Sequence, residues 1–506
     1  MAVQLPFTIK RPAVRLREAL TDPARRERTF VVALVLYAIV WTCYGAIAKS
    51  PQGLHPDMTE LIAWSRDPAF GYLKHPPFAA WLTAFWFSVW PFGAWFYYLL
   101  AMLMPALTLW LIWRMSADYL SVEKRIAGVA LLTLVPFFNF HALKYNVNTV
   151  LMPLWALTTW CFLRSYRGGS LGYAALAGAA AALCMLTKYW SVFLLAGLAL
   201  AALVDARRAK YFRSPAPWVT ILVGCVVLVP HLYWLTQHAY APFAYAVQVH
   251  GDKDYGASAL SALSYLGGSV AYVIVPLAVA LAVTPPSRKA WANVVWPAQP
   301  ERRLAAAAFW GPLLLPVAAA FAGAEITSLW SMSAWSLLPV LLFSSPMVKV
   351  RSLDNERVLL AAIALPLAML IASPMVAIVE QREAPPPERA QAQLLAAQID
   401  REWHGMTAEP LRYIGGDSAV ADAAAAYATD APLPLHLAPG VGAAQLARSG
   451  AALVCFAEDR VCRKSAAVQA AKIPGSRTIA SDITRDFLGF RGKPQRYTIV
   501  LLPPRP

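Results

Sequence analysis

The sequence has few charged residues: Asp, Glu, Lys and Arg make up 14% of its 506 residues, while hydrophobic residues make up 58%. Soluble domains carry about a quarter charged residues, so this composition excludes an ordinary soluble protein. The sequence also lacks a GxxxxGK[ST] phosphate-binding loop and an HExxH metal motif, which leaves ATPase and zinc-protease interpretations without support. Its long apolar runs hold almost no acids or bases, which is unusual for an ion-coupled transporter.

What the sequence does have is an excess of basic residues, with a formal net charge of +16. These residues lie in segments between the apolar runs, where membrane topology and lipid headgroups account for them. We therefore predict a multi-span membrane protein that is surrounded by membrane lipids and has no nucleic acid partner.

The apolar runs predict about eleven membrane-spanning helices, which together form a transmembrane domain over residues 30–380. Residues 1–29 are basic and are followed directly by an apolar run, which indicates a cytoplasmic N-terminus and an uncleaved first span. The predicted spans cover residues 30–48, 94–113, 126–141, 149–163, 171–187, 189–204, 218–236, 263–283, 304–321, 332–347 and 358–379.

The aromatic run Phe78–Trp90 is not counted as a span, because it is short and rich in residues that favour the membrane interface. Counting it would turn the basic loops between the later spans outward, against the positive-inside rule. We therefore predict an amphipathic or re-entrant helix on the outer surface, inside an outer loop over residues 49–93 that carries the active site.

An odd number of spans also places the end of the chain outside the cytoplasm. A proline-rich stretch around Pro385–Pro387 separates it from the last span, so residues 385–506 are predicted to be a small extracytoplasmic α/β domain. Within it, β-like runs at 411–414, 452–456 and 497–502 alternate with helical patterns at 419–427 and 443–447.

The six cysteines fall into two groups. Four lie in apolar runs and are interpreted as packing residues. Two lie in the C-terminal part, and if that part is extracytoplasmic, a disulfide over a short loop is an open alternative to two free thiols. The first group is Cys43, Cys161, Cys184 and Cys225, and the second is Cys455 and Cys462.

Asp57 is the candidate catalytic carboxylate, since it follows Pro56 a short distance beyond the first span. A carboxylate beside an apolar surface loses hydration and becomes a better general base. Glu60 lies one helical turn further and can share its face. The alternative is that both are solvated acids on the polar side of an interfacial helix.

Lysines occur singly in four separate outer loops or span ends, at Lys74, Lys144, Lys188 and Lys253. Together they can surround an anion such as a phosphate at the outer leaflet. The alternative for each is a lysine that reaches the interface from its own helix end. His75, beside Lys74 and before two prolines, either binds the same anion or only precedes the turn.

The stretch HALKYNVNT is unusually polar for a link between spans. Its side chains can cap helices or bind sugar hydroxyls, and the sequence leaves both open. The candidates for sugar or acceptor binding are Lys144, Tyr145, Asn146 and Asn148, with Glu60. No firm spacing of metal ligands occurs, so no metal site is assigned and no cofactor is required, although a divalent cation is not excluded.

The order of these motifs resembles one family. The motifs that carry the resemblance are PDMTE and GYLKHPP in the first outer loop, LMP at the start of a later span, and LTKY after a small-residue helix. The chain resembles the polyprenyl-phosphate-dependent glycosyltransferases of GT-C fold. These include protein O-mannosyltransferases and lipid A aminoarabinose transferases, in glycosyltransferase family 39. The resemblance covers roughly residues 30–240, and the C-terminal domain is similar to the aminoarabinose-transferase branch.

The resemblance implies an inverting sugar transfer from a polyprenyl-phosphate donor on the outer face. It assigns Asp57 as the catalytic carboxylate and places the donor phosphate at Lys74, His75 and Lys188. Two departures leave the sugar and the acceptor open. Met152 stands where the family often has an acid before Pro153, and the stretch GAEITSLWSMSAW, with Glu325, replaces a basic loop.

The sequence therefore predicts a bacterial inner-membrane glycosyltransferase that modifies lipid A or another envelope glycolipid. A protein O-glycosyltransferase of the same fold and a lipid-linked sugar flippase remain alternatives. A third alternative is a non-catalytic envelope assembly protein that works through its C-terminal domain.

Overall fold

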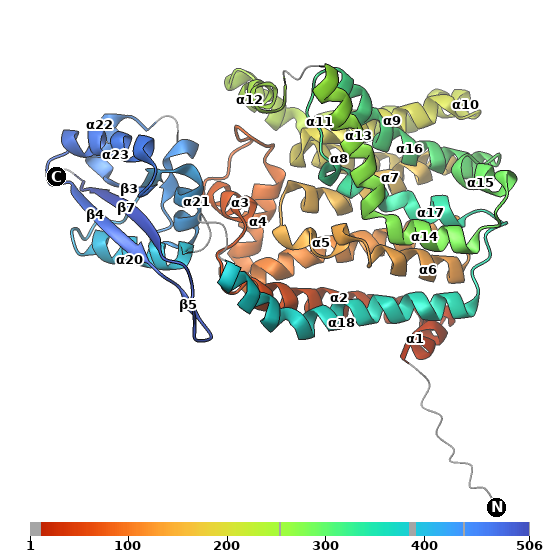
Figure 1. Cartoon of the computed structure of the whole chain (residues 1–506). Coiled ribbons are helices and arrows are strands. Elements are labelled where there is room, and N and C mark those ends of the chain that lie inside the picture. Colours follow the sequence, from red (N-terminus) through yellow and green to blue (C-terminus); the bar gives the residue numbers. More distant parts are fainter. Residues whose placement is uncertain (1–11, 252–254, 384–390, 439–440, 505–506) are drawn as a thin grey trace, which may run out of the picture. The chain divides into compact units, whose positions relative to one another are not determined.

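The computed structural model describes residues 12–251, 255–383, 391–438 and 441–504 (Figure 1). Contacts within the chain define two compact units. The first extends up to Thr42 and adds Phe70–Phe78 and Leu99–Ala368. The second comprises Cys43–Ala69, Ala79–Tyr98 and the chain from Met369 onward. Most of the predicted outer loop 49–93 thus packs with the C-terminal part of the chain rather than with the helices of the first unit.

The first unit is helical throughout its described residues. Three of its helices, α2 (Arg26–Ala48), α5 (Ala94–Ser116) and α18 (Ser352–Glu383), continue into the second unit. The others are α1 (Pro12–Thr21), α6 (Val122–Leu132), η1 (Pro136–Phe138), η2 (Ala142–Lys144), α7 (Val147–Gly168), α8 (Leu171–Thr187), η3 (Tyr189–Ser191), α9 (Val192–Val204), α10 (Arg208–Arg213), α11 (Ala216–Gln237), α12 (Ala241–His250), α13 (Tyr255–Tyr272), α14 (Ile274–Val283), α15 (Arg288–Val295), α16 (Pro300–Phe321), η4 (Ser328–Leu337) and α17 (Leu338–Phe343).

Five of the described helices are long and apolar enough to cross a membrane, namely α2, α5, α11, α16 and α18. Two bent pairs raise the number to seven if each is one span. In the first pair, Val122–Leu132 and Pro136–Lys144 meet at 78°, and in the second, Gly256–Tyr272 and Ile274–Val283 meet at 63°. The prediction of a multi-span, mostly helical protein is confirmed.

The predicted number of about eleven spans is larger than these five to seven. Helices do form at the other predicted positions. Helix α7 (Val147–Gly168) has 22 residues but is not apolar enough to be counted, whereas Leu171–Thr187, Tyr189–Val204 and Ser328–Phe343 have at most 17 residues. At a rise of 1.5 Å per residue the three short helices extend about 26 Å or less, short of a hydrocarbon core of roughly 30 Å. Hydropathy located these elements correctly, whereas the length of three of them and the composition of α7 do not qualify them as full spans.

Small residues let helices α8 and α11 approach each other closely. At Gly178 in α8, an added Cβ would lie under 3.0 Å from the backbone oxygen of Thr220 in α11, and Gly224 of α11 faces Gly178. The hydroxyl of Thr220 donates to the carbonyl of Ala174 across the same crossing, at 3.0 Å. In a membrane the hydrophobic effect does not drive helices together, so they associate through close packing at small residues of this kind.

The second unit combines helices with a five-stranded sheet of order β2-β1-β3-β7-β4. Strands β2, β1 and β3 run parallel, and β7 is antiparallel to both β3 and β4. Its elements are α3 (Pro56–Arg66), α4 (Phe78–Val89), α20 (Ala392–His404), β1 (Tyr413–Gly416), α21 (Ser418–Tyr427), β2 (Leu433–Pro434), η5 (Leu435–Leu437), α22 (Ala443–Ser449), β3 (Ala451–Phe456), α23 (Arg460–Lys472), β4 (Arg477–Ile483), β5 (Asp486–Phe487), β6 (Phe490–Arg491) and β7 (Gln495–Leu502).

The mixed sheet confirms the predicted C-terminal α/β fold, including strands near 411–414, 452–456 and 497–502. Alternate residues of β3 enter two separate cores: Val454 packs with Trp403 of α20, whereas Leu453 packs with Ala466 of α23. Because both faces are covered by helices, β3 is apolar along its whole length rather than alternating with polar residues. Strand β4 was not predicted, because its sequence RTIASDI is largely polar and lacks the apolar run that marked the other strands.

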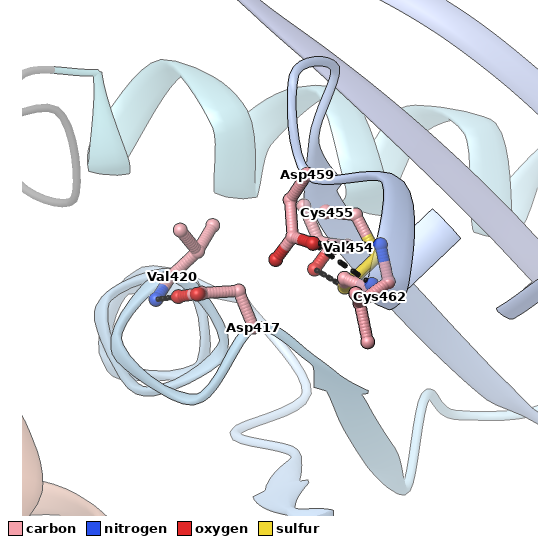
Figure 2. The surroundings of a disulfide bond; sticks show 7 residues. Asp417, Val420, Val454, Cys455, Asp459 and Cys462 are labelled. Atoms are coloured by element: carbon pink, nitrogen blue, oxygen red, sulfur yellow. Dashed lines mark hydrogen bonds between the residues drawn. A yellow bond between two sulfur atoms is a disulfide. The ribbon is translucent and has the colours of Figure 1, made fainter. Parts of the chain in front are cut away.

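Cys455 and Cys462 form a disulfide, which decides between the two alternatives that the sequence left open (Figure 2). The bridge joins the end of β3 to the first turn of α23. Beside it, the Asp459 carboxylate caps α23 by accepting hydrogen bonds from the backbone N–H groups of Val461 and Cys462, at 3.0 and 2.9 Å. The strand-to-helix turn is therefore held both covalently and by a helix cap.

Candidate active site

In the second unit, Asp57 lies in the first turn of α3, directly after Pro56. His55 caps this helix, and its Nδ1 accepts a hydrogen bond from the Asp57 backbone N–H at 3.3 Å. The same Nδ1 lies 3.7 Å from Oδ2 of Asp57, whose side chain is 36% exposed. The positive end of the helix dipole stabilises a carboxylate at this position. Asp57 is therefore accessible and oriented, as a general base must be.

Glu60 follows one turn later and is half-buried. The neighbouring positions Met58, Leu61 and Ile62 are fully buried, so the two acids share the more polar side of α3. This arrangement fits the predicted common face of Asp57 and Glu60.

Helix α3 is anchored on α21 of the same unit. The Arg66 guanidinium donates to the carbonyls of Ala425 and Ala426, at 2.5 and 3.1 Å, and burial lowers its pKa to about 10. The Tyr427 hydroxyl accepts from the backbone N–H of Leu54 at 2.9 Å. These contacts hold both ends of the segment that carries Asp57, and no sequence pattern predicted them.

In the first unit, Lys74 and His75 lie half-buried in the segment Phe70–Phe78, before the buried Pro76 and Pro77. The carbonyl of His75 accepts a hydrogen bond from the backbone N–H of Tyr72 at 3.1 Å, which closes a turn. Lys74 thus lies in a hydrogen-bonded turn rather than at a helix end.

Two residues of α11 fix this turn, and neither was identified from the sequence. His231 is buried, and its ring nitrogens bond to the Phe70 carbonyl at 2.6 Å and to the Tyr189 hydroxyl at 2.9 Å. An added Cβ at Gly71 would lie under 3.0 Å from the indole of Trp234, so only glycine allows this close approach. His231 connects the Lys74 turn to the residue that follows Lys188.

Lys188 lies where α8 ends, in extended backbone, and is only 8% exposed. Its ammonium donates to Oδ1 of Asn148 at 2.8 Å and lies 4.3 Å from the centre of the Trp330 ring. A desolvated ammonium over an indole face is stabilised by a cation–π interaction. The structure thus brings together one predicted phosphate ligand and one predicted sugar ligand, forty positions apart in the sequence.

The neighbouring polar residues are placed differently. Oδ1 of Asn146 caps α7 by accepting from the N–H groups of Asn148 and Thr149, so for Asn146 the capping alternative is observed. Tyr145 is fully buried in a strained backbone conformation with φ 30°. Lys144 is half-buried at the end of η2. Of the four candidates in this stretch, Asn148 makes a hydrogen bond to Lys188, a predicted phosphate ligand.

Trp330 lies in the stretch GAEITSLWSMSAW, which replaces a basic loop of the family and contains no cation. The aromatic residues of this stretch were the sequence signal from which a cation–π partner could have been predicted. Glu325 of the same stretch is exposed. Lys253 lies outside the described residues. Among the residues that the structure describes, no group of three or more His, Cys, Asp or Glu side chains is arranged to hold a metal ion.

The fold defines the class of this protein. Over 95% of the chain it is similar to the crystal structure of ArnT from Cupriavidus metallidurans in the apo state, with a TM-score of 0.65, 13% identity and 98% of that chain covered. The crystal structure of the same protein bound to undecaprenyl phosphate matches with a TM-score of 0.60, 13% identity and coverage of 93% and 97%. The chain has the ArnT-like GT-C fold.

Sequence comparisons narrow the class. Residues 74–234 match the family model described as dolichyl-phosphate-mannose-protein mannosyltransferase. The lipopolysaccharide core galacturonosyltransferase RgtB of Rhizobium johnstonii is 27% identical over 244 residues, which are 47% of this chain and 49% of that protein. The match thus spans about half the length of this curated relative. These findings confirm the resemblance to the polyprenyl-phosphate-dependent GT-C family.

Proposed function

We propose that this protein is an inverting glycosyltransferase that moves a sugar from a polyprenyl-phosphate donor to an envelope glycolipid on the periplasmic face of a bacterial inner membrane. The observation that carries the proposal is the buried Lys188–Asn148 pair, because it sets a cation beside a neutral polar group within the segment 74–234 that matches the family model. A cation supports a departing phosphate, and an amide suits a sugar hydroxyl.

In the proposed reaction, the acceptor hydroxyl gives its proton to the Asp57 carboxylate. Its oxygen forms a bond to the anomeric carbon from the side opposite the phosphate. The bond from this carbon to the phosphate oxygen breaks, and the polyprenyl phosphate leaves with the negative charge, which Lys74, His75 and Lys188 stabilise. Glu60, Lys144, Tyr145 and Asn146 remain candidates for positioning the sugar or acceptor.

A lipid acceptor is favoured by RgtB, whose name specifies the lipopolysaccharide core. The family model instead names a protein acceptor, so a protein O-glycosyltransferase is the second candidate. The undecaprenyl phosphate bound to the structurally similar ArnT supports a polyprenyl phosphate as the donor lipid. No step of the proposed reaction requires a metal or other cofactor.

The test compares envelope glycolipids by mass spectrometry in cells that carry the protein, lack it, or carry Asp57→Asn. We expect one glycolipid to lose a sugar-sized mass without the protein, and Asp57→Asn to lower its formation by at least a hundredfold, as for loss of a general base. Asp67→Asn, at the other end of α3, is the matched control and should keep full activity.

Each alternative has its own outcome. Unchanged glycolipids together with a lost sugar on an envelope protein would support the protein acceptor. Full activity of Asp57→Asn would support a flippase, which needs the lysines but no base. Loss of function on truncation after Glu380, with no effect of substitutions at Asp57 or Lys188, would support an envelope assembly protein.

A further inference from the structure

A lipid-sized cavity lies in the first unit, among helices that the proposed reaction does not use. It has a volume of about 750 Å³ and is lined by residues of α1, α2, α6 and α18, and by Trp113 of α5. Ligand pockets typically have volumes of about 300–1,000 Å³, so this cavity, here called the N-terminal groove, is large enough for one ligand.

The walls of the N-terminal groove are almost entirely hydrocarbon. Leu20 of α1, Leu34 of α2, Ile126 of α6 and Ile363 of α18 represent the four helices that line it. The one tyrosine in its wall, Tyr37, already donates its hydroxyl proton to the carbonyl of Phe138 at 2.6 Å. Such a surface favours an alkyl chain over a sugar or a nucleotide.

Charge is confined to one end of the groove. Its charged lining residues are Arg25 and Arg28, at the beginning of α2. Arg25 makes an exposed ion pair with Asp22 at 2.7 Å. Arg28 is exposed and makes no ion pair with the described residues. An arginine guanidinium binds a phosphate with two parallel hydrogen bonds, so this end is suited to a phosphate group.

The length of the groove matches one leaflet. Along α2 it extends from Arg28 to Val40, which is about 18 Å at 1.5 Å per residue, and the hydrocarbon of one leaflet is roughly 15 Å thick. Its side is open, because the lining residues Val32, Leu36 and Leu367 are 50%, 57% and 45% exposed. A chain can therefore enter sideways from the bilayer.

We propose that the N-terminal groove binds one anionic phospholipid from the leaflet on the N-terminal side of α2. Its phosphate lies against Arg25 and Arg28, and an acyl chain lies between α2 and α18. The occupant is a two-chain phospholipid rather than the donor lipid. The groove is only about as long as one leaflet is thick, which is too short for a polyprenyl chain. This site is independent of the proposed transferase function.

The test uses the full-length protein in detergent and native mass spectrometry, with added phosphatidylglycerol, phosphatidylcholine of the same chains, or undecaprenyl phosphate. We expect one molecule of phosphatidylglycerol to stay bound, and phosphatidylcholine to be lost. Arg25→Gln combined with Arg28→Gln should weaken phosphatidylglycerol binding about 30-fold, since a basic residue near an anionic lipid is worth about a factor of five.

A second variant tests the chain rather than the phosphate. Ala362→Trp fills the groove from α18 and should abolish the bound lipid while both arginines remain. Arg208→Gln, an exposed arginine of α10 outside the groove, is the matched control and should bind normally. Equal retention of phosphatidylcholine, preferential retention of undecaprenyl phosphate, or variants that bind like the control would each overturn the proposal.

Discussion

Lys188 carries a positive charge at a place that water scarcely reaches. Burying an ammonium is costly, and here one neutral amide and one indole ring compensate for the lost hydration. Asn148 contributes a neutral amide rather than a carboxylate, and a cation held by such a group is a suitable partner for an incoming anion. This is the physical reason for assigning Lys188 to the donor phosphate rather than to the fold alone.

The first prediction follows at the scale of this residue. Lys188→Met keeps the length of the side chain but removes the charge, so we expect kcat/KM for the donor to fall at least a hundredfold, with the thermal transition changed by only a few degrees. Sugar transfer assayed in detergent with a polyprenyl-phosphate sugar measures the first, and a melting curve the second. Lys210→Met, on the exposed face of α10, should change neither.

A substitution at Asn148 distinguishes a structural role of the Lys188–Asn148 pair from a catalytic role. Asn148→Asp would convert the neutral partner into a carboxylate that neutralises Lys188. If the ammonium serves the donor phosphate, this variant should be nearly as inactive as Lys188→Met while remaining folded. Full activity of Asn148→Asp would contradict the assignment.

At the scale of elements, the crossing of α8 and α11 depends on one position. Gly178→Val would drive two methyl groups into the backbone of α11 at Thr220, where neither chain can yield without separating the helices. We expect little folded protein in detergent, measured by monodisperse yield on size-exclusion chromatography.

Gly172 provides the control, because it lies in the same helix with open space around it. Gly172→Val should give a normal yield. Equal yields of the two variants would show that the crossing is not limited by this contact.

A second element-scale prediction concerns the turn between β3 and α23. Replacing Cys455 and Cys462 with alanine removes the disulfide, which closes a loop between cysteines seven positions apart. Loop-closure entropy then predicts that the unfolding free energy of the C-terminal sheet falls by about 2 kcal/mol. Hydrogen exchange of β3 and α23 should become correspondingly faster. Cys225→Ala, a free cysteine of α11, should leave this exchange unchanged.

At the scale of the whole molecule, charge and redox chemistry point to one topology. Basic residues between the spans favour a cytoplasmic position of the inner loops, and a disulfide is stable chiefly outside the cytoplasm. The two observations have different physical origins and agree with the periplasmic C-terminal domain that is part of the proposed function.

Single cysteines introduced into a background without exposed thiols test this topology. A membrane-impermeant maleimide applied to spheroplasts should label Leu488→Cys, in the loop between β5 and β6, and should not label Lys210→Cys. Lysing the cells should make both positions reactive. Labelling of Lys210→Cys in intact spheroplasts would reverse the topology and, with it, the side of the proposed reaction.

The sequence by itself determined the class and the local elements. Long apolar runs require a membrane, and the alternation of short apolar strands with alanine-rich helices was sufficient for the C-terminal α/β domain. The motifs around Asp57, Lys74 and Lys188 were sufficient for the family. These features are local, because hydropathy, periodicity and motif spacing act over a few to about twenty residues.

Only the tertiary structure decided which distant residues meet. It paired Lys188 with Asn148 and Trp330, used Asn146 as a helix cap and joined Cys455 to Cys462. It also reduced the described helices that are long and apolar enough to span a membrane to five to seven. The physical reason is that each of these depends on how helices cross and where they end. Side-chain packing between segments far apart in the chain sets both, and no local pattern records it.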